Sequence, residues 1–288
     1  MSHIKVAVTG ANGQVGQEFV SVLKNNRKYE VYGLNKRDLD VTDAKQVVAV
    51  MTNINPDIVI HAAAYTKVDL AEKNHELAYR INEIGTQNIA EATANLQAKL
   101  VYISTDYVFS GNTDTPYNEW DPPDPINIYG KTKLAGEQIV KDTLTKHFIV
   151  RTSWVYGENG ENFVKNMLRL AREKQQLQIV KDQIGSPTST VDLVNAILSM
   201  MESEEYGIYH VTNDGSCSWY EFAVAIFKEA EVAVDVCPCL TEDFPSVAKR
   251  PKYSVLNHVM SKEKGFPKMR HWREALSDFM KSYAQKKN

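Results

Sequence analysis

The strongest constraint on the fold lies at the start of the chain, where an apolar run at residues 4–9 leads directly into three glycines spaced three apart. An amphipathic stretch follows to about Lys24. Glycines let the backbone turn tightly and approach a ligand, and the free amides at a helix start favour a phosphate. This order of strand, loop and helix predicts a dinucleotide site, although a turn that merely needs glycine stays open. The expected contacts are Gly10, Asn12, Gly13, Gln14, Val15 and Gly16.

The end of the second predicted strand, residues 30–34, bears on the choice of cofactor. An NAD-selective site usually carries an acid about 20 residues past the glycine loop, where it binds the ribose hydroxyls. Here Lys36 and Arg37 stand in that place. Two cations suit the 2'-phosphate of NADP, so the sequence favours NADPH and leaves NADH open; a solvated loop is the alternative. Asp40 and Val41 follow in a segment that resembles the turn beside an adenine.

Strands and helices alternate as far as about residue 152, which predicts an α/β fold with a doubly wound parallel sheet. A third strand at residues 58–61 ends in small residues, which leave room for a ligand at the sheet edge or serve helix packing. A long helix is expected at about 74–96, before a fourth strand at 99–104. The further cofactor contacts expected from this part are Ala62, Ala63, Ala64, Tyr65 and Asn82.

A helix predicted at about residues 128–144 places Tyr129 and Lys133 on one face, because side chains four residues apart on a helix are neighbours. A free tyrosine has a pKa of about 10, and a nearby cation lowers it. Tyr129 is therefore a candidate general acid or base. The spacing also arises by chance in ordinary helices. Thr105, just after the fourth strand, supplies a hydroxyl where such a residue needs a hydrogen-bond partner.

The pattern becomes less regular after residue 152, as expected of a smaller α+β substrate-binding domain. We expect a Rossmann domain at residues 1–152 and mainly the substrate domain at 153–288, with about 177–202 returning to the first domain. A strand is also expected at 208–211. Arg250 lies in a loop with a second cation, which suits a diphosphate or a solvated surface.

Composition excludes several classes of function. The 288 residues carry a formal net charge of −3 with both signs interspersed, so no nucleic-acid partner is expected. No apolar run approaches the length of about 20 residues that spans a bilayer, and the chain starts without a signal-peptide pattern, so we expect a cytoplasmic protein without membrane contact. The three cysteines and scattered histidines lack zinc-like spacing, so no metal site is expected.

Taken together, these residues resemble an extended short-chain dehydrogenase/reductase, and more narrowly the dTDP-4-dehydrorhamnose reductase family. The likeness covers almost the whole chain, and its strings are more specific than any single motif. They are residues 61–69 (HAAAYTKVD), 104–109 (STDYVF), 129–137 (YGKTKLAGE), 151–157 (RTSWVYG) and 182–188 (DQIGSPT).

The resemblance implies a role for each matching residue. Tyr129 would protonate the oxygen of a 4-keto sugar as NADPH delivers hydride to its carbon, giving dTDP-L-rhamnose from a dTDP-sugar substrate. Lys133 would bind the nicotinamide ribose and lower the pKa of Tyr129, and Thr105 would bond to the same oxygen. The implied substrate contacts are Val68, Thr105, Asp106, Tyr107, Tyr129, Trp154 and Arg250.

Other functions are also consistent with the sequence. An epimerase or dehydratase acting on nucleotide sugars would use the same Tyr129 and Lys133, and a non-catalytic regulatory subunit shares the fold. Some members of the family dimerise around Mg²⁺; Glu18 matches one of the acidic positions, whereas the second match is the shorter Asp192. Both a monomer and a homodimer are therefore consistent with the sequence.

Overall fold

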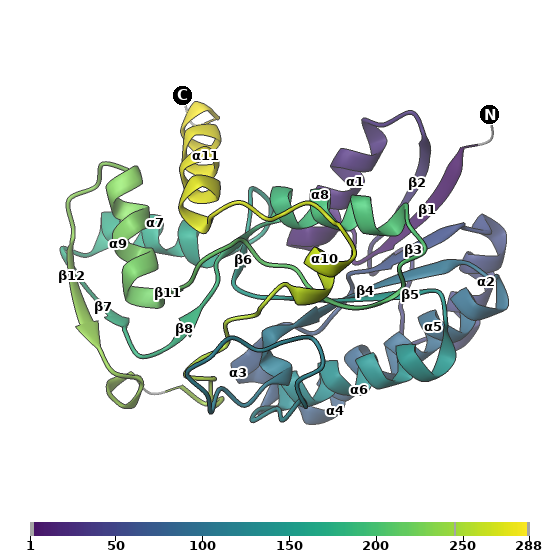
Figure 1. The fold of residues 1–288 in the computed structure, drawn as a ribbon, viewed down its shortest axis with the longest axis horizontal. Coiled ribbons are helices and arrows are strands. Elements are labelled where there is room, and N and C mark those ends of the chain that lie inside the picture. The colour runs from purple at the N-terminus through teal and green to yellow at the C-terminus, as the bar shows by residue number, and fades with distance from the viewer. Residues whose placement is uncertain (1–2, 245, 287–288) are drawn as a thin grey trace.

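A central sheet of six parallel strands organises the fold. The protein is described by a computed structural model, which covers residues 3–244 and 246–286. The strand order is β2-β1-β3-β4-β5-β10 (Figure 1). The strands are β1 (Ile4–Thr9), β2 (Tyr29–Leu34), β3 (Ile58–His61), β4 (Lys99–Thr105), β5 (His147–Thr152) and β10 (Gly207–His210). Most of their residues are buried, as expected for a parallel sheet that is covered on both faces. The predicted doubly wound sheet is confirmed.

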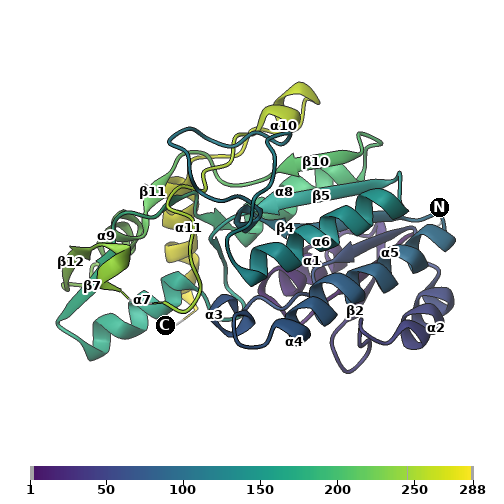
Figure 2. The same ribbon diagram turned by 90° about the horizontal axis from the view of Figure 1, so that it is seen from below.

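Helices cover the sheet on both sides (Figures 1 and 2). One layer contains α1 (Gln14–Lys24) and α8 (Thr190–Met201), which pack against each other. The opposite layer contains α2 (Ala44–Ile54), α5 (Gly85–Asn95) and α6 (Ile128–Thr143). Because the strands alternate their side chains between the two layers, each face has its own apolar core.

The helix predicted at 74–96 is interrupted in the structure. It consists of α4 (His75–Tyr79), a π-helical turn at Arg80–Ile84, and α5. Such turns insert an extra residue into a helix and are frequent at functional sites. Here the turn contains Asn82, whose side chain is almost fully buried.

A smaller lobe stands beyond the carboxyl edge of the sheet (Figure 1). Its parallel pair β7 (Gln176–Val180) and β12 (Asp235–Cys239) packs with α7 (Phe163–Glu173), α9 (Trp219–Glu229) and α11 (Trp272–Gln285) around a third apolar core. The start of α9 is fixed by a capping box between Ser218 and Glu221, which satisfies backbone amides that a helix start leaves unpaired.

The chain crosses between the lobes more often than the sequence indicated. Within residues 177–202, α8 packs on the main sheet, whereas 177–180 belongs to β7 of the small lobe. The strand expected at 208–211 is β10, which joins the main sheet beside β5 instead of the small lobe. A domain boundary near residue 152 stays a prediction.

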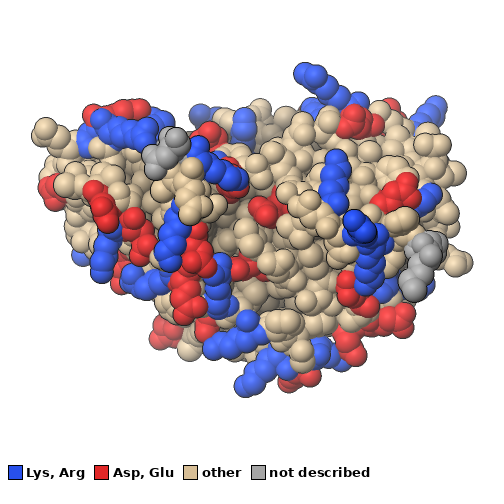
Figure 3. Space-filling view, turned by 90° about the horizontal axis from the view of Figure 1, so that it is seen from above, with Lys and Arg blue, Asp and Glu red and all other residues tan. Residues whose placement is uncertain are grey.

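Short elements complete the described chain. They are α3 (Val68–Ala71), α10 (Val259–Glu263), the pairs β6 (Val155–Tyr156) with β9 (Thr188–Ser189) and β8 (Ile184–Gly185) with β11 (Cys217–Ser218), and 3₁₀ turns at Asp106–Val108 and Thr241–Asp243. Of the helices described, none is long and apolar enough to cross a membrane. Figure 3 shows cationic and anionic side chains interspersed over one face of the molecule.

Candidate active site

The glycine loop lies against the end of β3, where the strand order reverses. Gly10 has a positive φ of 66°, and a Cβ atom there would lie only 2.6 Å from the backbone nitrogen of Ala63. Only glycine permits this approach. Beside the loop is a cavity of about 370 Å³, at the point where open α/β sheets bind their ligands. It is lined by Gly10, Asn12, Gly13, Asn35, Lys36, Leu39, Asp40, Val41, Thr42, Ala62, Ala63, Ala64, Leu77, Arg80 and Ile81.

Three residues predicted to bind the cofactor do not line this cavity, and their contacts with a cofactor stay a prediction. Gln14 joins the lobes: its Nε2 donates to the carbonyl of Val155 (3.0 Å), and its Oε1 accepts from Asn162 (2.8 Å). Gly16 packs on the loop itself, because a Cβ atom there would meet the carbonyl oxygen of Gly10 at 2.2 Å. Val15 packs against the sheet core. These three residues shape the loop and do not line the cavity.

Two hydrogen bonds join the side chain of Asn82 to the backbone of Tyr65. The amide of Asn82 accepts from the backbone N–H of Tyr65 (2.7 Å) and donates to the carbonyl of Tyr65 (3.1 Å) and to the hydroxyl of Thr132 (2.9 Å). Asn82 thereby joins the end of β3 to the helix of Tyr129. It fixes the geometry of the site and does not itself line the cavity.

Two cations face the cavity, but they are not the expected pair. Lys36 lines it, whereas Arg37 is exposed outside it. The second cation is Arg80, which sequence reasoning missed because its position depends on the π-helical turn. Asp40 lies near Lys36 and Arg80, and hydrogen bonds from Thr42 and these charges lower its pKa. Its carboxylate is therefore ionised at neutral pH.

Tyr129 stands at the start of α6, which begins where the side chain of Asn127 accepts from the backbone N–H of Gly130 (2.8 Å). The ring of Tyr107 meets the ring of Tyr129 edge-on at 5.8 Å. Burial raises the pKa of Tyr129 to about 12, although a hydrogen bond with Thr105 opposes the shift. The phenol is therefore protonated at neutral pH, contrary to the expectation that its pKa is lowered.

Lys133 is nearly fully buried and turns toward the sheet. Its Nζ lies 3.9 Å from the centre of the Tyr102 ring on β4. Burial lowers the pKa of Lys133 to about 7, and the charge of Glu137 opposes the shift. The predicted neighbour pair Tyr129 and Lys133 is thus present on α6, but the nearest described partner of the ammonium is the ring of Tyr102.

Thr105 and Asp106 follow β4 at the same edge. The hydroxyl of Thr105 donates to Oδ1 of Asp106 (3.0 Å) and accepts from the backbone N–H of Tyr107 (3.2 Å). Asp106 is 2% exposed, and burial raises its pKa to about 7. Its Oδ2 has no hydrogen-bond partner among the described residues. A buried polar atom of this kind fits a site that is completed by a ligand.

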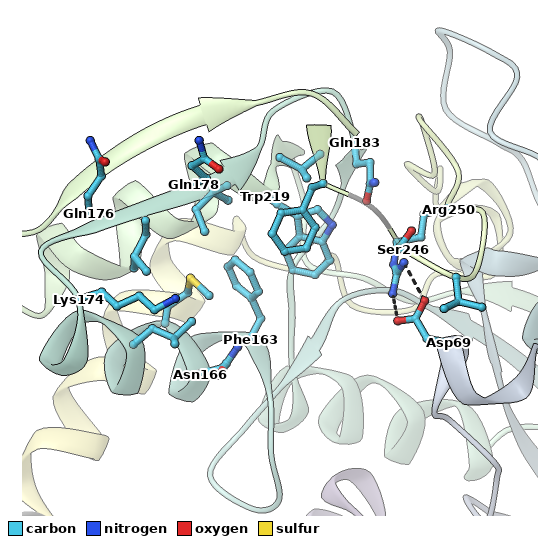
Figure 4. Close-up of a pocket in the computed structure, with 17 residues that line it drawn as sticks. Asp69, Phe163, Asn166, Lys174, Gln176, Gln178, Gln183, Trp219, Ser246 and Arg250 are labelled. Carbon is cyan, nitrogen blue, oxygen red and sulfur yellow. Dashed lines mark hydrogen bonds and ion pairs between the residues drawn. The ribbon is translucent and has the colours of Figure 1, made fainter. Parts of the chain in front are cut away.

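A second cavity, of about 990 Å³, opens between the lobes (Figure 4). At one end, Arg250 makes a bidentate ion pair with Asp69 of α3, at 2.6 and 3.2 Å. The side chains of Phe163 and Trp219 project into its middle. Lys174 of the segment after α7 lies toward the far end. This cavity combines aromatic faces with two cations.

Trp154 lies behind this cavity. It has a positive φ of 47°, and its indole stacks on Trp219 with ring centres 3.5 Å apart. Trp219 lines the cavity, and no sequence pattern predicts it because the two tryptophans are far apart in the chain. Val68, the remaining predicted substrate contact, begins α3 beside Asp69.

The acidic residues considered for a magnesium ion have other partners. Glu18 accepts from the hydroxyl of Thr190 (3.0 Å). Asp192 accepts from the guanidinium of Arg270 (2.9 Å) and from the amide of Asn213 (2.7 Å). In the described ranges, no cluster of three or more His, Cys, Asp or Glu residues has the geometry of a metal site.

Comparison with known proteins decides the family. A family model described as the RmlD substrate binding domain matches residues 4–285. The chain belongs to this family. The RmlD match spans both lobes and contains both cavities.

Individual relatives agree with the family. The spore coat polysaccharide biosynthesis protein SpsK of Bacillus subtilis is 47% identical and covers 96% of both chains. A dTDP-4-dehydrorhamnose reductase of Aggregatibacter actinomycetemcomitans is 38% identical over 98% of this chain and 99% of its own. A dTDP-4-keto-6-deoxy-D-glucose reductase of Streptomyces niveus is 37% identical over 94% of each. The crystal structure of the dTDP-4-dehydrorhamnose reductase of Bacillus anthracis in complex with NADP superposes with a TM-score of 0.96 at 50% identity, covering 98% of this chain and 100% of the other.

Proposed function

We propose that this chain catalyses the NADPH-dependent reduction of dTDP-4-dehydro-6-deoxy-L-mannose (dTDP-4-dehydro-L-rhamnose) to dTDP-L-rhamnose, a precursor of surface polysaccharides. The observation that carries the proposal is the place of Tyr129, on α6 beside Thr105, at the sheet edge that also bears the cavity of the glycine loop. The relatives named dTDP-4-dehydrorhamnose reductase support the choice of substrate.

The cavity beside the glycine loop fits the adenosine half of NADPH. Small residues at Gly10 and Ala63 leave the backbone accessible to a diphosphate. Lys36 and Arg80 supply positive charge for a 2'-phosphate, and Asp40 supplies an acceptor for an adenine amine. The NADP complex of the similar Bacillus anthracis enzyme supports the same cofactor here.

Tyr129 acts as the general acid in this proposal. Because its pKa lies near 12, it holds its proton until negative charge develops on the oxygen of the 4-keto group. NADPH, when bound, supplies the hydride. The Thr105 hydroxyl would turn from Asp106 to donate a second hydrogen bond to the same oxygen. Lys133 binds the nicotinamide ribose and stabilises the phenolate that remains after proton transfer.

The dTDP part of the substrate would occupy the cavity between the lobes. Arg250 and Lys174 supply charge for the diphosphate, while Trp219 and Phe163 offer apolar faces. Trp154 would support this surface through its stack on Trp219. Asp106, Tyr107 and Val68 would shape the sugar end of the cavity.

Assembly and location are part of the same proposal. We propose a cytoplasmic enzyme that works as a monomer or homodimer, without nucleic-acid or membrane partners. The ion pair between Asp192 and Arg270 argues against a magnesium-bridged dimer through this carboxylate.

The test is oxidation of NADPH, followed by its absorbance, with dTDP-4-dehydro-6-deoxy-L-mannose as substrate. Tyr129→Phe is expected to lower kcat by about 10²–10⁴-fold. A second arm offers dTDP-4-keto-6-deoxy-D-glucose, because one similar relative is named for that sugar. A higher kcat/KM for the D-gluco sugar would replace the proposed substrate. If neither NADPH nor NADH is oxidised with either sugar, the result would favour an epimerase, a dehydratase or a regulatory subunit.

A further inference from the structure

Lys133 has an unusual environment for a cation. The residue is only 2% exposed, and its ammonium lies over an aromatic ring. Burial of a charge is costly unless nearby groups stabilise it. The ring face of Tyr102 lies against the ammonium, with the ring centre 3.9 Å away. The negative face of an aromatic ring attracts a cation at this distance.

Tyr102 is held rigidly where it is. The ring is fully buried on β4 and stacks on His61 of β3, with centres 5.8 Å apart. Its hydroxyl donates to the carbonyl oxygen of Lys133 (3.2 Å). Gly136 lets α6 come this close, since a Cβ atom there would lie 2.2 Å from the Tyr102 hydroxyl oxygen. The ring therefore offers Lys133 a fixed surface.

The other titratable groups around Lys133 do not replace this contact. On its own helix these are Glu137, which is bonded to Arg151, and Tyr129, which is protonated. On β3, burial and the charge of Lys133 lower the pKa of His61 to about 3, so that its imidazole is neutral. Tyr102 is the group that directly faces the ammonium.

We propose that Tyr102 is a positioning residue for Lys133: its ring face holds the ammonium charged and in place before the nicotinamide ribose binds. The inference rests on the role proposed above for Lys133. It adds Tyr102 as the residue that positions the ammonium of Lys133 for that role. When NADPH binds, the same ammonium would add hydrogen bonds to the ribose hydroxyls and keep its contact with the ring of Tyr102.

The test changes the charge of the ring face and keeps its volume. Phe and 3,4,5-trifluorophenylalanine are placed at position 102, and the Kd for NADPH is measured by fluorescence across a pH series. Fluorine withdraws negative charge from the ring face. Relative to Tyr102→Phe, the fluorinated protein is expected to bind NADPH several-fold more weakly above neutral pH. The pH at which the affinity for NADPH falls should also be lower in the fluorinated protein than in Tyr102→Phe, by about half a unit or more. Equal affinities and equal pH profiles would overturn the inference.

Lys133→Met separates this inference from the proposed function. In that background, the two rings at position 102 are expected to give the same Kd, because no ammonium remains to be held. A fluorine effect that persists without the lysine would show a purely structural role for Tyr102 and would overturn the inference. If Lys133→Met alone leaves NADPH binding unchanged, the role proposed for Lys133 fails first. Thermal unfolding of each variant confirms that it is folded under the assay conditions.

Discussion

Replacing Gly10 with alanine tests the close approach between the glycine loop and β3. The φ of 66° is left-handed, a conformation that costs an alanine about 1–2 kcal/mol. The new Cβ atom would also lie 2.6 Å from the nitrogen and 2.7 Å from the Cα atom of Ala63. Forcing a carbon into well-packed surroundings costs about 1–3 kcal/mol more. We therefore expect Gly10→Ala to lower the free energy of unfolding by about 2–5 kcal/mol.

Gly265 provides a matched control. Its φ of 72° is also left-handed, but no heavy atom lies within 4 Å of a Cβ atom built there. Gly265→Ala should therefore lose only the backbone part, about 1–2 kcal/mol. Urea unfolding followed by tryptophan fluorescence measures both variants, and NADPH titration measures the site. We expect Gly10→Ala alone to weaken NADPH binding. Equal losses of stability and unchanged NADPH affinity in both variants would refute the close approach.

Three further changes test the site and its supports. Lys36→Gln is expected to raise the KM for NADPH about ten-fold and to leave the KM for NADH nearly unchanged, because a charged contact to the 2'-phosphate is lost; Arg37→Gln, outside the cavity, is the control, and equal effects would contradict the assignment. Lys133→Met is expected to raise the thermal unfolding midpoint more at about pH 6 than at about pH 10. The reason is that the pKa of Lys133 is about 7 in the folded chain and ordinary in the unfolded one, so its burial costs stability most below pH 7; an equal shift at both pH values would contradict this. Glu137→Ala leaves Arg151 buried without its carboxylate and should cost about 3–5 kcal/mol in chemical unfolding, whereas a loss below about 1 kcal/mol would show that water replaces the pair.

Local signals in the sequence account for the parts of the fold that were predicted. The run from β1 through the glycine loop to α1 carries its own evidence, because buried strands, tight turns and amphipathic helices each leave a short pattern. The alternation of such units gives a parallel sheet with few choices of topology. The placement of Gly10, Lys36, Asp40 and Ala62 to Ala64 along one cavity follows from that topology.

Features that depend on distant contacts left no such pattern. Arg80 reaches the cavity beside the glycine loop from a π-helical turn, and no local propensity separates that turn from an ordinary helix. Asp69 and Arg250 are 181 residues apart, yet they form a bidentate pair at the mouth of the second cavity. Trp154 was identified by family resemblance, but its partner Trp219 lies on α9 of the small lobe. Their pairing depends on how the lobes fold and not on either neighbouring sequence.

The pair Tyr129 and Lys133 shows most clearly what spacing alone leaves out. Their spacing of four positions on a helix predicted that the two side chains are close, and closeness to a cation predicted a lowered pKa for the phenol. Burial dominates instead: it raises the pKa of Tyr129 to about 12 and lowers that of Lys133 to about 7. A phenol pKa above neutral pH suits a reduction, because the acid must keep its proton until hydride transfer creates a base on the substrate oxygen. A phenol already ionised at neutral pH would have no proton to give. In the proposed reaction the lysine would act after proton transfer, when a phenolate has formed and a nearby positive charge stabilises it.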